Sequence, residues 1–194
     1  MVKEIELKFY PVDKDEIRGR LSAAGFRLDA PEFMMTRATF DAPPHLGKSW
    51  GRVRTEKDRV TMSIKCVDSL CLTGTSEWQV VVNSFDAAVG FMSAAGFRKK
   101  AIQENTREIW IRESVEATID TWPGLDPYIE IESEASDEDI AVAAVYKAVS
   151  DLGFNKDDAM FGSSDLVYEK ILGIPSHDIC SLPEITFDNP PVKK

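Results

Sequence analysis

The sequence is poor in the residue types on which nucleophilic and metal-thiolate chemistry depends. Of its 194 residues only three are cysteine and two are histidine. The cysteines, at positions 66, 71 and 180, are odd in number and lack the spacing of a zinc site. A disulfide framework, a zinc centre and a Cys/His nucleophile are therefore poorly supported.

Long apolar runs and glycine-rich phosphate loops are lacking too. The longest uninterrupted apolar run, Ile140–Tyr146, has seven residues, whereas a membrane-spanning helix needs about 20. Glu4 and Glu6 stand where a secretory signal would have its apolar core, so we expect a cytoplasmic protein with no membrane partner. Neither G-x-x-x-x-G-K nor G-x-G-x-x-G occurs.

Positive charge is in deficit. There are 23 Lys and Arg residues against 33 Asp and Glu, which gives a formal net charge of -10. This balance argues against binding of long nucleic acids, and taken alone it would argue against any anionic substrate. Part of the excess lies in one segment, 132–139, where five of eight residues are acidic. The composition, 43% hydrophobic and 29% charged, is otherwise that of an ordinary globular domain.

A seven-residue segment occurs twice. Leu-Ser-Ala-Ala-Gly-Phe-Arg at 21–27 returns as Met-Ser-Ala-Ala-Gly-Phe-Arg at 92–98, an offset of 71 residues. Each copy ends an amphipathic stretch that we predict to be helical, 13–24 and 84–95, with glycine at the stop position. Two helices that converge on the same ending are the alternative, but six identical residues in a row favour a duplicated strand–helix–strands unit.

The remaining pattern predicts an α+β domain with a mostly antiparallel sheet. Alternating segments bounded by turn residues predict strands at 3–10, 34–40, 51–56, 59–66, 75–82, 105–111, 115–121 and 127–133. Further helices are expected from about 137 to 152 and near 166–171. Four prolines between 175 and 191 interrupt the end of the chain. We therefore expect one domain over 1–172 and a tail over 173–194 that wraps it or is mobile.

Charged side chains follow one face of several predicted strands. Glu4, Glu6 and Lys8 alternate with apolar residues in the first strand, and Arg52 and Arg54 do so in a later one. Because the helices cover the apolar faces, the charged face either meets solvent in an open sheet or lines a closed barrel. Solvated faces are commoner. A face built for solubility would mix the two signs, however, and the segregation of acids from bases favours the barrel.

Two E-x-E pairs, Glu4 with Glu6 and Glu130 with Glu132, suit a hard cation. Such a pair sets two carboxylates on one face of a strand, about 6.5–7 Å apart. Two pairs on nearby strands can supply oxygen ligands to Mg²⁺ or Mn²⁺. Arg and Lys rows beside them can neutralise a polyphosphate, with arginine binding phosphate oxygens bidentately. The charged face therefore predicts a site for a metal ion and a polyphosphate.

At these residues the sequence resembles the CYTH superfamily, also called triphosphate tunnel metalloenzymes. That group includes class IV adenylyl cyclases, thiamine triphosphatases, inorganic triphosphatases and fungal-type RNA triphosphatases. The resemblance covers roughly 3–172. It rests on an ordered series of matches, namely Glu4-Ile-Glu6-Leu-Lys8, Arg52-Val-Arg54, Lys65 at a strand end, Arg107, Asp120, and Tyr128-Ile-Glu130-Ile-Glu132.

The resemblance implies an eight-stranded antiparallel β-barrel (the triphosphate tunnel) from two related halves, with helices packed outside. It implies catalytic roles for Glu4, Glu6 and Lys8. Phosphate binding is expected at Lys8, Arg52, Arg54, Lys65 and Arg107, together with Arg37, the repeat counterpart of Arg107 at an offset of 70. Metal binding is expected at Glu4, Glu6, Asp120, Glu130 and Glu132, with Mg²⁺ or Mn²⁺ as the cofactor.

Simple structural roles are the alternative at several of these positions. Arg52 and Arg54 could pair with Glu56 and Glu77 across strands, and Asp120 could cap the turn after it. Tyr168 could close the tunnel end or serve packing alone.

Two positions depart from the family pattern. An acid of the middle strand is Gln79, and a lysine near Arg107 is Asn105. Each change removes one charge from the tunnel.

The residues and the resemblance together favour metal-dependent hydrolysis of a small triphosphate compound. The alternatives are a class IV adenylyl cyclase, which forms cAMP and pyrophosphate from ATP, and a polyphosphate- or nucleotide-binding protein without turnover. The absence of a promising Ser/His/Cys set is consistent with phosphoryl chemistry, in which positioning and charge neutralisation supply most of the catalysis.

Overall fold

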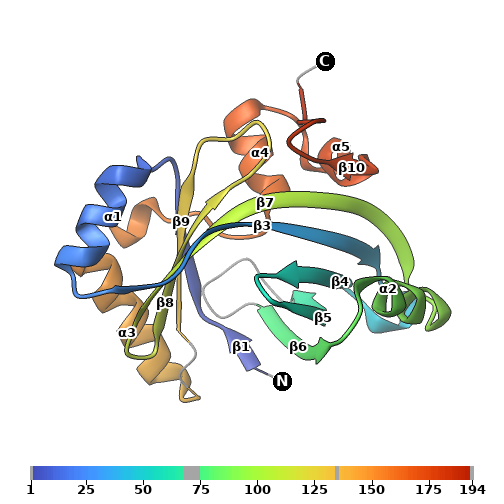
Figure 1. The fold of residues 1–194 in the computed structure, drawn as a ribbon, viewed down its shortest axis with the longest axis horizontal. Coiled ribbons are helices and arrows are strands. Elements are labelled where there is room, and N and C mark those ends of the chain that lie inside the picture. Colours follow the sequence, from blue (N-terminus) through green and yellow to red (C-terminus); the bar gives the residue numbers. More distant parts are fainter. Residues whose placement is uncertain (1, 68–74, 134–135, 193–194) are drawn as a thin grey trace.

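The structure is a computed structural model that describes residues 2–67, 75–133 and 136–192 (Figure 1). Its strands are β1 (Val2–Glu4), β2 (Glu6–Phe9), β3 (Arg27–Asp41), β4 (Ser49–Glu56), β5 (Arg59–Val67), β6 (Thr75–Val82), β7 (Arg98–Arg112), β8 (Val115–Thr121), β9 (Tyr128–Ser133) and β10 (Glu184–Ile185). Its helices are α1 (Lys14–Ala23), α2 (Phe85–Ala94), α3 (Glu138–Asp151), α4 (Ser164–Leu172) and α5 (Ser176–Ser181), with 3₁₀ turns η1 (Pro44–Leu46) and η2 (Lys156–Asp158).

The strands form one strongly curled antiparallel sheet (Figure 1). Its order is β1-β6-β5-β4-β3-β7-β8-β9-β2, and β10 adds to β7 in parallel. The strand expected over 3–10 is divided at Ile5. Its first part pairs with β6 and its second with β9, so one stretch of chain joins the two ends of the sheet. Counted with β1 and β2 as one strand, the sheet has the expected eight antiparallel strands. The predicted α+β tunnel fold is confirmed.

The two halves of the sheet correspond. On either side of the central β3–β7 pair, the order β3-β4-β5-β6 is matched by β7-β8-β9-β2. The bounds of α1 and α2, and those of β3 and β7, differ by the 71 residues of the sequence repeat. The offset of 70 between Arg37 and Arg107 reflects register shifts within the β3–β7 pair. Both side chains reach the same face of the sheet.

Three helices end in the same way. After α1, α2 and α3 a glycine with positive φ is followed by a phenylalanine whose N–H donates to a carbonyl in the last helical turn. This is the Schellman arrangement, for which glycine is preferred. The pairs are Gly25–Phe26, Gly96–Phe97 and Gly153–Phe154. Since α3 lies outside the duplicated unit, the ending alone can arise from capping. The evidence for two related halves is therefore the matching order of strands.

The helices cover the apolar outer face of the sheet, as expected. One core cluster joins α1 and α3 to β2, β8 and β9, with Leu21, Ile131 and Val145 each 0% exposed. A second joins α2 to β3 and β4 around Phe40, Val53 and Met92. Because the apolar strand faces are buried outward, the charged residues of the same strands face the interior of the curl.

The chain beyond 159 packs against the sheet. β8 pairs with β7 over Thr106–Arg112. β10 pairs with β7 at Ile102 and Gln103, on the part of β7 that precedes its pairing with β8. A third cluster joins this segment to the β8–β9 turn, and in it the Tyr168 hydroxyl donates to the Pro123 carbonyl at 2.6 Å. Residues 173–192 therefore contain α5 and β10, and β10 extends the sheet beside β7. No helix of the described residues has both the length and the apolarity to cross a membrane.

Candidate functional site

The inner face of the curled sheet encloses a cavity of about 720 Å³. Two groups of charged residues line opposite parts of it. A cationic wall is formed on β3, β4 and β5 by Arg37, Arg52, Arg54 and Lys65. An acidic wall is formed on β2, β8 and β9 by Glu6, Glu116, Glu130 and Glu132. The bases and acids are thus concentrated in different parts of the cavity, although Glu56 and Glu77 lie beside the arginines and Lys8 lies among the acids.

The cationic wall is crowded and buried. Arg37 and Arg54 stand directly opposite each other on β3 and β4, and Arg52 lies two residues further along β4. Each is 6–7% exposed. Burial and the neighbouring guanidinium groups lower the pKa of Arg37 well below its usual value and that of Arg54 to about 10. Like charges held at this density are stabilised by an anion.

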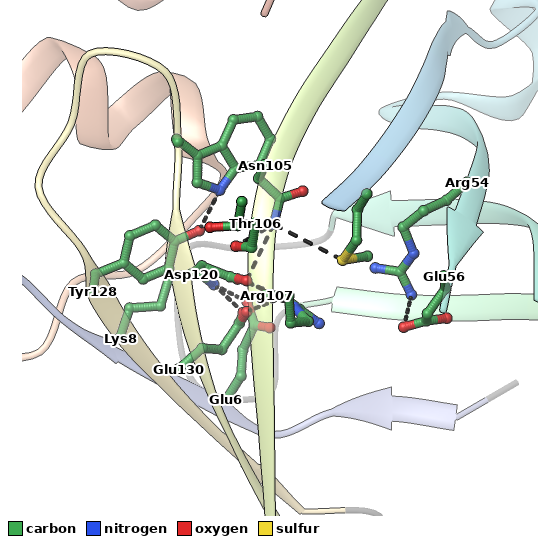
Figure 2. Close-up of polar contacts among 12 residues, drawn as sticks. Glu6, Lys8, Arg54, Glu56, Asn105, Thr106, Arg107, Asp120, Tyr128 and Glu130 are labelled. Atoms are coloured by element: carbon green, nitrogen blue, oxygen red, sulfur yellow. Dashed lines mark hydrogen bonds and ion pairs between the residues drawn. The ribbon is translucent and has the colours of Figure 1, made fainter. Parts of the chain in front are cut away.

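The arginines pair on one side only. Arg52 Nη2 donates to Glu77 at 2.9 Å. Arg54 Nη2 donates to Glu56 at 3.0 Å (Figure 2). The cross-strand pairing considered from sequence is therefore present. The Nε atoms of Arg37, Arg52 and Arg54 are buried and have no hydrogen-bond partner among the described residues. Buried donors are normally satisfied, and three such donors in one cavity suit a ligand with several acceptor oxygens.

The acidic wall is set by the pairing of β2 with β9. Glu6 lies opposite Glu132, and Lys8 lies opposite Glu130. Burial, followed by the negative charge of Glu130, raises the pKa of Glu6 to about 7. Burial and the charges of Glu130, Glu116 and Glu6 also hold the pKa of Glu132 well above its usual value. These carboxylates repel one another, and a cation between them would relieve the repulsion.

Lys8 stands within the acidic wall. Its ammonium group contacts Glu6 and lies 2.9 Å from Glu130. Burial alone would lower the pKa of Lys8, but the two carboxylates outweigh it and raise that pKa well above its usual value. In the same way, burial favours protonation of Glu130, yet Lys8, Glu6 and Arg107 hold the Glu130 pKa well below its usual value.

A buried polar cluster lies between the two walls, and Figure 2 shows its members Asn105, Arg107, Asp120 and Glu130. Arg107 donates to both oxygens of Asp120, at 2.8 and 2.6 Å, and to Glu130 at 3.1 Å. Asn105, which is 0% exposed, donates to Asp120 at 3.1 Å and accepts from Arg37. The amide that replaces a lysine of the family pattern therefore bridges a cation of one wall and the Asp120–Arg107 pair beside the other.

The donor set fits a hard divalent cation. In the described part of the chain, no three His, Cys, Asp or Glu side chains lie close enough together to form a complete protein cage for a metal. Mg²⁺, however, is commonly held by one or two carboxylates, waters and substrate phosphates. Glu6 and Glu132 face each other across β2 and β9 and suit this role, although Glu6 also contacts Lys8, whereas Asp120 and Glu130 already accept hydrogen bonds from Arg107. The expectation that Asp120 and Glu130 bind metal stays a prediction.

The structure brings most of the predicted site residues to one cavity. Ten line it or belong to its polar clusters, namely Glu6, Lys8, Arg37, Arg52, Arg54, Lys65, Arg107, Asp120, Glu130 and Glu132. The backbone of Glu4 belongs to β1, but its side chain lies outside the described residues. Gln79 lines the cavity opposite Ser63, in an exposed position. Tyr168 is fully buried against Pro123 and is not a cavity-lining residue.

Sequence reasoning missed the aromatic residues of the site. The Arg37 guanidinium lies 4.6 Å from the centre of the Trp122 ring, and the Trp122 indole N–H donates to the Tyr128 hydroxyl at 2.9 Å. Trp50 lies 5.9 Å from both Arg52 and Lys65. Trp50 could have been predicted to line the site, because it lies two residues before Arg52 in an alternating strand and therefore on the same face. Trp122 follows the end of β8, where alternation gives no prediction.

Comparison with known proteins assigns the fold to a family. The CYTH domain family matches residues 2–159 of this chain. The chain is a member of the CYTH family. None of the curated proteins matches this CYTH chain.

Solved structures share the CYTH fold at low sequence identity. A putative adenylate cyclase from Vibrio parahaemolyticus is 14% identical, with 89% of this chain and 99% of that one covered and a TM-score of 0.70. The PH1819 protein of Pyrococcus horikoshii is 24% identical over 86% and 99% of the two chains, with a TM-score of 0.68. HpAC1 from Hippeastrum, a putative adenylyl cyclase with a dominant triphosphatase activity, is 15% identical over 88% and 95%, with a TM-score of 0.57. These likenesses bear on the fold alone.

Proposed function

We propose that this CYTH protein is a divalent-metal-dependent triphosphatase that hydrolyses a small triphosphate compound inside the curled sheet. The observation that carries the proposal is the cationic wall, with three buried arginine Nε donors that lack a partner among the described residues. A phosphate chain offers many acceptor oxygens and enough negative charge to offset this crowding.

The two walls have different tasks in this proposal. Arg37, Arg52, Arg54 and Lys65 bind and orient the phosphate chain, and Arg107 supports them from the central cluster. Glu6 and Glu132 hold Mg²⁺ or Mn²⁺ against the phosphates, with Glu130, Asp120 and Glu4 as further candidates. When bound, the metal ion supplies charge neutralisation and an activated water. Lys8 lies between Glu6 and Glu130 and keeps the acidic wall compact before substrate enters.

The test is a product analysis with purified protein. Tripolyphosphate and ATP are each incubated with Mg²⁺ or Mn²⁺, and orthophosphate, pyrophosphate and cAMP are measured. Release of orthophosphate that stops in EDTA supports the proposal. Formation of cAMP with pyrophosphate would replace it with the cyclase, which uses the same walls. Tight binding without either product would leave a binding protein.

Replacing Glu132 with glutamine should weaken the response to metal. The change removes one carboxylate charge without altering size, so we expect the Mg²⁺ concentration for half-maximal phosphate release to rise about tenfold or more. Titration of activity with Mg²⁺ measures the effect. The matched control is Glu113→Gln, on the exposed β7–β8 turn, whose titration should follow the wild type. A Glu132→Gln curve that overlays the control would remove Glu132 from the metal-binding set.

A further inference from the structure

Arg37 differs from the other buried arginines of the cavity in what holds it. Those arginines each donate to a carboxylate, in the pairs Arg52–Glu77, Arg54–Glu56 and Arg107–Asp120. Arg37 is as buried as they are, yet it makes no ion pair with any residue that the structure describes. Its hydrogen-bond partner in that part of the chain is the neutral amide of Asn105.

An aromatic ring stands where a carboxylate would be expected. The Arg37 guanidinium lies 4.6 Å from the centre of the Trp122 ring, well inside the range of about 6 Å over which a ring attracts a cation. Burial and the neighbouring arginines lower the pKa of Arg37, and the electron-rich face of the ring favours the charged form. Unlike a carboxylate, the ring does this without accepting strong hydrogen bonds from the guanidinium N–H groups.

The Trp122 ring is fixed independently of Arg37. Trp122 lies in the β8–β9 turn, where its carbonyl accepts from the Leu125 N–H at 3.0 Å. Its indole N–H donates to the Tyr128 hydroxyl at 2.9 Å, and both side chains are 3% exposed. The strand order is β3-β7-β8-β9, so the Arg37 side chain reaches across β7 to meet a ring that is already held in place.

The contacts of Arg37 leave donors for a ligand. Nη2 donates to Asn105, whose own amide donates to Asp120 at 3.1 Å and is thereby oriented. Nε is buried and has no hydrogen-bond partner among the described residues. A guanidinium whose N–H groups remain available can bind phosphate oxygens through two of them. A lysine at position 105, as in the family pattern, would set a cation against Arg37 instead.

We infer that Trp122 is a positioning residue, which holds the Arg37 guanidinium with its N–H donors directed to the phosphate chain of the ligand. The inference rests on the proposed function for the identity of that ligand. Trp122 itself acts through Arg37 and not on the reacting atoms. Its removal should therefore weaken phosphate binding only when Arg37 is present.

A double-mutant cycle in the full chain tests this dependence, with tripolyphosphate as the probe. Kd is measured by calorimetry in EDTA, and KM and kcat are measured with Mg²⁺. Trp122→Met should raise Kd and KM about tenfold and change kcat little, because the attraction between ring and cation is lost. Trp122→Phe keeps an aromatic face and should stay within about threefold of the wild type. In an Arg37→Met background, Trp122→Met should change Kd less than about twofold.

Trp78→Met is the matched control, since Trp78 lies on β6, is 48% exposed and does not line the cavity. It should bind tripolyphosphate like the wild type. If Trp122→Met does not fold, Tyr128→Phe replaces it in the cycle. That change removes the acceptor of the indole N–H, and it should weaken binding about threefold only when Arg37 is present.

Two results overturn the inference and leave the proposed function intact. One is a wild-type Kd in Trp122→Met. The other is an equal loss of affinity with and without Arg37, which would assign Trp122 or Tyr128 a role in packing or a direct ligand contact. Binding without hydrolysis overturns the proposed function, whereas the cycle of Kd values still decides the role of Trp122. Absence of both binding and hydrolysis overturns both.

Discussion

Replacing Arg54 with alanine should reduce kcat/KM for triphosphate hydrolysis by about 10²–10³-fold, the usual cost of removing one preorganised charge-stabilising donor. Arg54 lies opposite Arg37, is 6% exposed, and has an Nε atom without a partner among the described residues. The substitution removes the positive guanidinium group that would bind the phosphate chain of the substrate. Steady-state phosphate release and Kd from calorimetry measure the effect.

The same substitution should not unfold the protein. Relief of the repulsion within the cationic wall offsets the removal of the ion pair with Glu56, so we expect the thermal midpoint without ligand to change little. Arg27→Ala is the matched control, since Arg27 lies on β3 with an exposed side chain paired to Asp29 at 3.6 Å. Wild-type affinity in Arg54→Ala would show that triphosphate does not bind at the cationic wall.

Replacing Asp120 with asparagine should cost about 3–5 kcal/mol of unfolding free energy, because it leaves the buried Arg107 charge without its main partner. Asp120 is 1% exposed and accepts two hydrogen bonds from Arg107 and one from Asn105. For a chain of this length the corresponding fall in Tm is roughly 6–20 °C. Urea and thermal unfolding without phosphate or divalent cations measure it.

Asp151→Asn is the control for that experiment. Asp151 also accepts from an arginine, Arg112, at 2.7 Å, but it lies at the surface, where water screens the pair. We expect no measurable change in its unfolding. If Asp120→Asn unfolded like this control, the polar cluster between the walls would be unimportant for stability.

The sequence predicted the elements that local chemistry determines. The predicted helices 13–24 and 84–95 correspond to α1 and α2, whose N-caps are Asp13 and Ser84, and alternation located most strands. β3 and β7 are longer than the predicted 34–40 and 105–111, because their first halves are polar and their register is irregular. The tail showed prolines and no periodicity. Its short helix α5 packs against α4 and its two-residue strand β10 pairs with β7, and no local pattern encodes these contacts.

Side-chain alternation, together with the family resemblance and the repeat for Arg107 and Arg37, identified residues that share the cavity, since each predicted phosphate-binding residue lines it. It could not show how they are connected. Asn105 was interpreted as a missing charge, but buried between Arg37 and Asp120 it serves as a neutral link. The pairing of Lys8 with Glu130 likewise depends on the β2–β9 register, which joins segments more than a hundred residues apart and has no local signal.

The divided N-terminal strand has a consequence for how this protein folds. Residues 6–9 find their partners only at 129–132, so the curl cannot be completed until nearly the whole sheet has been synthesised. Long sequence separation between contacting residues slows folding. Until that pairing forms, β6 and β9 present unpaired backbone edges, which are sites of aggregation. Closure thus depends on contacts far apart in the sequence, and we expect substitutions of the buried Leu7 and Phe9 to reduce the yield of soluble protein.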